Sequence, residues 1–201
     1  MLKNINLKAT FLSIVLLFIS CDKDDTPEAE NEMELITKAV IVVTNLSDDS
    51  SQTFNFEVEE HDHNHVHSVL IQNQDDDDHG DHTVIELKSG SEYKFENSFL
   101  NESDPNNIID MTDEVKEEKD EHHIHYELAG NGIEIVSYSG EDTIDSNGNA
   151  LNLVTKWTTS TATEIDVEAY LIHRPTTKTG NTRDDFGGAT DVEIEFEALV
   201  E

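Results

Sequence analysis

Two histidine-rich tracts contain the residues whose types and spacing could do chemistry. The first spans residues 61–82 and includes HDHNHVH and DDDDHGDH, and the second is EHHIHYE at 121–127. Imidazole nitrogens with carboxylate oxygens are the donors that divalent transition metals favour. The candidate metal ligands are therefore His61, His63, His65, His67, Asp78, His79, Asp81, His82, His123 and His125.

The spacing of these histidines places imidazoles in pairs. In a strand, residues two apart share a face and lie about 6.6 Å apart along the chain, within joint reach of one ion. In a helix, His61 would share a face with His65, and His63 with His67. The donor set suits Zn²⁺ best, with Cu²⁺ and Ni²⁺ as competitors and Ca²⁺ less suited to the histidines. The alternative is a solvated loop that binds metal only incidentally.

Three other motifs favour structural roles. His61 and His63 match the opening of the H-x-H-x-D-H motif of metallo-β-lactamase-like enzymes, but His65 and Val66 stand where the motif needs Asp and His. We therefore expect no enzyme. DTIDSNGN at 142–149 resembles a calcium loop, but Thr143 replaces a required acid, so the sequence favours a turn. His173 falls on the inward side of its predicted strand and is interpreted as structural.

Two-residue alternation of apolar and polar side chains dominates the chain from Leu35 onward and predicts half-buried strands. One helix is predicted at 112–120, with Thr112 as a possible N-cap. If 122–128 buries Ile124, then His123 and His125 share the opposite face, and His122 points inward. The predicted strands cover 35–45, 52–60, 66–73, 82–88, 91–99, 122–128, 132–138, 151–159, 163–173 and 190–199.

Many short strands separated by turn residues predict an all-β fold, an antiparallel β-sandwich of the immunoglobulin-like or jelly-roll-like kind. Turns are expected at Ser89-Gly90, Asn131-Gly132, Asn147-Gly148 and Gly187-Gly188. We expect residues 35–201 to form this single domain, with 61–82 as a His/Asp-rich loop.

The first 20 residues are typical of an export signal. Lys3 and Lys8 precede an apolar run from Phe11 to Ile19, which is too short to span a bilayer. The run ends in Leu-Phe-Ile-Ser-Cys21, which resembles the lipobox of bacterial lipoproteins, and Cys21 is the only cysteine. The resemblance implies that Cys21 carries a covalent lipid, and several acyl chains would anchor the protein stably.

A strongly acidic composition follows this anchor. The formal net charge is −33, and removal of the signal leaves about −35, so nucleic acid and anionic lipid are repelled while cations are attracted. Residues 22–34 are expected to form a disordered acidic tether. Its start, Asp22-Lys23-Asp24-Asp25, resembles the signals that carry Bacteroidetes lipoproteins to the outer face of the outer membrane. The alternative is an ordinary tether on a periplasm-facing protein.

Three segments resemble a family of small Bacteroidetes envelope lipoproteins: LKSGSEYKFENSFLNES at 87–103, EDTIDSNGNALNL at 141–153, and residues 171–201. Members are often labelled as type 1 periplasmic binding folds, a name for two α/β domains, whereas the strand-rich pattern here predicts a sandwich. The His/Asp-rich tract resembles, in composition, the loops of zinc-binding solute-binding proteins.

These observations together predict a lipid-anchored outer-membrane protein that captures or buffers zinc, with a TonB-dependent transporter as a possible partner. The alternative is a surface interaction or solute-binding module without a functional metal.

Overall fold

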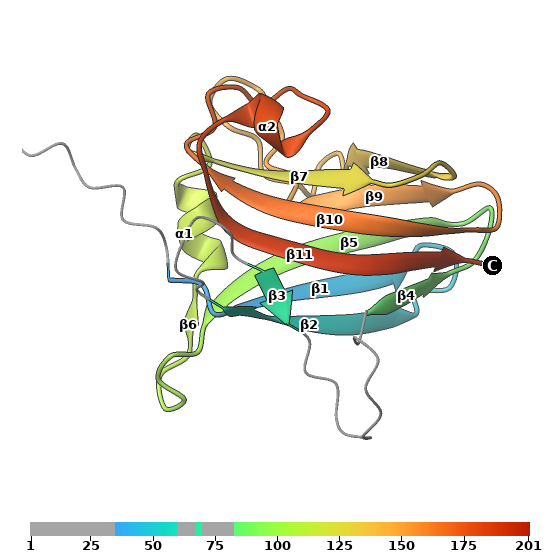
Figure 1. The fold of residues 1–201 in the computed structure, drawn as a ribbon, viewed down its shortest axis with the longest axis horizontal. Helices are drawn as coiled ribbons and strands as arrows, with labels where there is room; N and C mark the ends of the chain where they lie inside the picture. Colours follow the sequence, from blue (N-terminus) through green and yellow to red (C-terminus); the bar gives the residue numbers. More distant parts are fainter. Residues whose placement is uncertain (1–34, 60–66, 70–82) are drawn as a thin grey trace, which may run out of the picture. The chain divides into compact units, whose positions relative to one another are not determined.

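The computed structural model describes residues 35–59, 67–69 and 83–201 (Figure 1). The chain divides into two units, residues 1–32 and 33–201, and the second contains every described residue. Cys21, the predicted export signal and the acidic tether at 22–34 lie outside the described residues. Within the described ranges, no helix is both long and apolar enough to cross a membrane.

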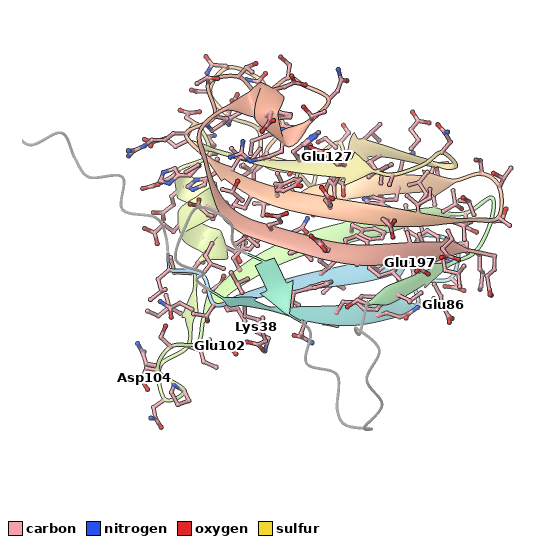
Figure 2. All side chains as sticks on the ribbon, in the orientation of Figure 1. Lys38, Glu86, Glu102, Asp104, Glu127 and Glu197 are labelled. Carbon is pink, nitrogen blue, oxygen red and sulfur yellow. The ribbon has the colours of Figure 1, made fainter. Side chains whose placement is uncertain are left out.

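The larger sheet has seven strands in the order β3-β2-β1-β5-β9-β8, with β6 paired to β5. All of its pairings are antiparallel. An ion pair of 3.3 Å joins Lys38 of β1 to Glu102, just beyond β5 (Figure 2). The strands are β1 (Lys38–Asn45), β2 (Ser51–Glu59), β3 (His67–Val69), β5 (Glu92–Asn101), β6 (Ile109–Asp110), β8 (Ile133–Ser137) and β9 (Val154–Thr159).

The smaller sheet has four strands in the order β4-β11-β10-β7. Its strands are β4 (Val84–Leu87), β7 (His122–Leu128), β10 (Thr163–His173) and β11 (Ala189–Val200). β10 pairs antiparallel with both β7 and β11, whereas β4 runs parallel to β11. The predicted β-sandwich is therefore confirmed, with one parallel pairing in place of a fully antiparallel arrangement.

Aromatic side chains fill the space between the two sheets. Trp157 of β9 is fully buried and stacks on Phe95 at 3.9 Å between ring centroids. From the other sheet, Tyr126 meets the indole edge-on at 5.3 Å and Phe196 lies 6.2 Å from it. Burial of each such side chain contributes about 1.5–3 kcal/mol to stability. Contacts of this kind hold the two sheets face to face.

Two short helices complete the fold: α1 (Thr112–Glu117) and α2 (Arg183–Phe186). The predicted N-cap at Thr112 is wrong, because Met111 occupies the cap position and the Thr112 hydroxyl instead bonds the backbone of Phe99. Neither β6 nor α2 was predicted from the sequence. Both elements are shorter than the windows over which periodicity can be recognised.

Candidate metal centre

α1 and three strand ends meet at one end of the smaller sheet. Figure 1 shows α1 beside the start of β7, the end of β10 and the start of β11. β7 begins at His122 and β10 ends at His173, and these two residues are direct cross-strand partners. The topology therefore brings together side chains that are 51 positions apart in the sequence.

His122 and His173 are both buried, with side chains 0% and 4% exposed. Their rings stack at 4.8 Å between centroids and 16° between planes. His122 Nδ1 lies 3.2 Å from the backbone oxygen of Glu118. Because a carbonyl oxygen can only accept, Nδ1 carries the hydrogen in that bond, and a neutral His122 then presents its lone pair at Nε2.

Asp191 enters the same buried space through a β-bulge. The pairing of β10 with β11 slips between Leu171 and Ile172, so that Asp191 is an extra residue between Thr190 and Val192. A bulge re-aims side chains, and here Asp191 and its neighbour Val192 are both buried. Asp191 Oδ2 lies 3.7 Å from His122 Nε2 and 3.8 Å from His173 Nδ1.

Glu118 approaches the two histidines from the solvent side. One carboxylate oxygen of Glu118 and one ring nitrogen from each of His122 and His173 lie within 4.8 Å of one another. Glu118 itself is exposed, just after α1. These residues form a group that could hold a metal ion, and we call Glu118, His122, His173 and Asp191 the buried histidine cluster.

Glu121 and Arg174 form the rim of this cluster. Glu121 Oε2 lies 3.8 Å from His173 Nε2 and accepts a hydrogen bond from the Arg174 guanidinium. That bond lowers the pKa of the Glu121 carboxyl below its usual value. Glu121 is therefore ionised at neutral pH and paired with Arg174. The buried members of the cluster, His122, His173 and Asp191, lie next to one another inside this rim.

Gly188 allows β10 and β11 to meet at the cluster. Its φ of +70° is unfavourable for residues with a side chain, and a Cβ atom at this position would clash with the carbonyl oxygens of His173 and Arg174. The predicted turn at Gly187-Gly188 is thus confirmed. It places the start of β11, and with it Asp191, against the last residue of β10.

The predicted ligands His123 and His125 lie on the other face of β7, beneath α2. His123 is buried, its Nδ1 lies 3.1 Å from the oxygen of Ala150, and its ring stacks on Phe186 at 5.1 Å. Burial lowers the pKa of His123 to about 4, and burial also lowers the pKa of His125. His125 Nε2 lies 3.9 Å from Glu127, which Figure 2 shows on β7.

Most of the predicted ligands cannot be placed. His61, His63, His65, Asp78, His79, Asp81 and His82 lie outside the described residues, and His67 begins β3. Among the residues that the structure does describe, the only group in which three ligand atoms lie within 4.8 Å of one another is Glu118, His122 and His173. The structure brings neither His123 nor His125 into that group.

This group was not among the ligands predicted from the sequence, although one signal pointed to it. His122 and His173 share the inward side of their strands with apolar residues, where a histidine is unusual and needs a partner. The predicted ligands are instead close to one another along the chain. The pairing of His122 with His173 depends on strand order, which the sequence does not reveal.

A scan against protein families finds no match for this chain, and searches of curated proteins and of solved structures find none either. The candidate metal centre therefore depends on the geometry of the buried histidine cluster alone.

Proposed function

We propose that this protein binds a divalent transition metal ion, with zinc the best suited, through Glu118, His122 and His173. The observation that carries the proposal is the pair of stacked, buried imidazoles at the end of the smaller sheet, with a carboxylate of Glu118 beside them. A buried imidazole with no hydrogen-bonding or metal partner is costly. Within the described chain, neither ring nitrogen of His173 has a hydrogen-bond partner.

The proposed setting is the cell envelope. The signal at residues 1–20 would direct export, lipid on Cys21 would anchor the protein at the outer membrane, and the acidic chain would concentrate cations near it. The His/Asp-rich residues 61–82 would collect metal ions in the same electrostatic field, and hand-over to an outer-membrane transporter is part of the proposal. Capture or buffering of zinc is the function that combines these features.

The experiment is metal titration of the purified chain lacking residues 1–20, in four forms. These are the wild type, a loop variant in which the histidines of residues 61–82 are replaced by alanine, a His173→Ala variant, and a variant carrying both changes. Substitution keeps the backbone of β3, which lies within this segment. We expect the loop variant to keep one tight zinc site, which His173→Ala abolishes. His125→Ala is the matched control and should leave that site intact. Equal tight binding by the loop variant and the double variant would contradict the proposal, and no binding by the wild type would favour an interaction module.

The anchor has its own test. Replacing Cys21 by Ser removes the thiol that would carry the lipid, so the protein should move from the membrane fraction to the soluble fraction. Mass spectrometry of the wild-type protein extracted from membranes should show acyl chains on Cys21. An unmodified Cys21 in that material would contradict the lipid anchor.

A further inference from the structure

We infer that Asp191 is a further ligand of the metal ion and that the ion lies among His122 Nε2, His173 Nδ1 and Asp191 Oδ2, with Glu118 as the fourth donor. The inference rests on the metal-binding function proposed above. It adds a residue that the close-lying group of Glu118, His122 and His173 does not contain, and it specifies the chemical class of the ion.

The burial of the Asp191 carboxylate supports this assignment. Its side chain is 0% exposed, and within the described chain neither oxygen accepts a hydrogen bond. A buried carboxylate in this state is costly, and proteins satisfy such a group with a cation or with hydrogen bonds. A ring nitrogen of His122 and a ring nitrogen of His173 lie within 4 Å of the Asp191 carboxylate. A cation placed between these groups would satisfy all three.

The distances from Asp191 to the two histidines are also close to those between ligands of one metal ion. The separations of 3.7 Å and 3.8 Å between Asp191 Oδ2 and the two ring nitrogens are too long for hydrogen bonds. Two ligands of one tetrahedral zinc ion, each about 2.0–2.1 Å from the metal, lie about 3.3 Å apart. The separations from Asp191 Oδ2 to the two ring nitrogens exceed that spacing by only about 0.4–0.5 Å, so Asp191 and each histidine lie close to the spacing of two ligands of one ion, and binding would draw the two rings toward it.

The backbone contact of His122 supports the same assignment. Its Nδ1 hydrogen is directed to the backbone oxygen of Glu118, so a neutral ring has its lone pair at Nε2, which lies 3.7 Å from Asp191 Oδ2. Metal-binding histidines typically donate their second ring N–H to a carbonyl or carboxylate in this way. A metal ion bound by both Nε2 and the carboxylate would be attracted to each of them.

Charge and donor number identify the class of ion. Two neutral imidazoles with the carboxylates of Asp191 and Glu118 carry a charge of −2, which one divalent cation neutralises. Two nitrogen and two oxygen donors suit tetrahedral Zn²⁺ or Co²⁺, whereas Ca²⁺ requires six to eight oxygen donors and Mg²⁺ octahedral oxygen coordination. Glu118 is the exposed donor, so the ion would reach the buried donors from its side.

The test uses Co²⁺ as a probe of the chain lacking residues 1–20, with the histidines of residues 61–82 replaced by alanine, because tetrahedral Co²⁺ absorbs visible light far more strongly than octahedral Co²⁺. We expect the wild type to give the intense tetrahedral spectrum. Asp191→Asn should weaken Co²⁺ affinity by about 1,000-fold or more, beyond the 10–100-fold typical of residues that only orient a ligand. Asp166→Asn is the matched control, since it removes an exposed charge from the same sheet.

The results of this test distinguish a failure of the Asp191 assignment from a failure of the proposed metal-binding function. If the wild type binds no Co²⁺, both fail. If the wild type binds Co²⁺ and His173→Ala abolishes binding, but Asp191→Asn changes neither the spectrum nor the affinity by more than about 100-fold, the function stands and the ligand assignment is overturned. An octahedral spectrum in the wild type would likewise overturn the tetrahedral assignment.

Discussion

Asp191→Asn should stabilise the metal-free protein and destabilise the zinc-loaded protein. In the presence of a chelator, the wild type retains a buried carboxylate whose oxygens accept no hydrogen bond within the described chain. The asparagine has the same shape without the charge, and its amide can donate to the lone pair at His122 Nε2. We expect a gain of about 1–3 kcal/mol, or about 2–12 °C in Tm for a domain of this size.

With saturating zinc, the wild type should become more stable than the Asp191→Asn variant. A ligand that binds only the folded state stabilises it by about 4 kcal/mol at about 1,000 times its dissociation constant, and the wild type alone retains the full donor set. Thermal unfolding of both proteins with chelator and with zinc measures the effect. If Asp191 has a purely structural role, the Asp191→Asn variant should be less stable than the wild type under both conditions. The control Asp166→Asn should unfold at the wild-type temperature with chelator and with zinc.

Strand positions could be predicted from the sequence because alternation is a local property. Ile165, Val167 and Leu171 occupy one face of β10 as predicted, and all three are buried. The same two-residue alternation correctly placed His122 on the inward side of β7. The predicted turn at 142–149 is also confirmed, since Asp145 accepts hydrogen bonds from the backbone N–H groups of Asn147 and Asn149.

The buried histidine cluster could not be predicted in the same way because its contacts are not local. The alternation of β11 places Val192 inward and so predicts that Asp191 points outward, but the bulge turns both side chains inward. The stacking of His122 on His173 further requires that β7 and β10 be neighbours. The extra residue at the bulge and the order of the strands therefore decide where the candidate site forms.

Asp145 also forms a buried ion pair that no local sequence pattern indicates. Of all the substitutions considered, we expect replacement of Asp145 to reduce stability the most. Asp145 and Lys178 form an ion pair of 3.1 Å with side chains 1% and 6% exposed. Lys178 also donates to the backbone oxygen of Lys119, and Asp120 binds both the backbone N–H and the hydroxyl of Ser146. These contacts connect the segment before β7, the 142–149 turn and the segment after β10.

Replacing Asp145 by Ala should destabilise the protein by about 3–5 kcal/mol, because it leaves the buried Lys178 ammonium without its counter-charge. Urea unfolding at neutral pH measures the loss. The matched control is Asp113→Ala, which breaks an exposed pair with Lys116 at 3.4 Å and should cost less than about 1 kcal/mol. Equal losses for the two variants would contradict a special role for the buried pair.

The pH dependence follows from the direction of the Asp145 pKa. Burial alone would raise the pKa of this carboxyl, but hydrogen bonds from Asn149, Lys178 and Asn147 outweigh burial and hold the pKa well below its usual value. A depressed pKa in the folded state means that the stabilisation is fully present above the unfolded value of about 3.9 and is lost as the pH falls below it.

The stability difference between the wild type and Asp145→Asn should therefore be largest at neutral pH and shrink as the pH falls through about 4. A difference that stays constant from neutral pH to about pH 3 would show that shape, and not charge, makes Asp145 important. Because the same contacts hold the segments that carry Glu118 and His173, we expect Asp145→Asn to weaken zinc binding as well, by less than the loss of a ligand does.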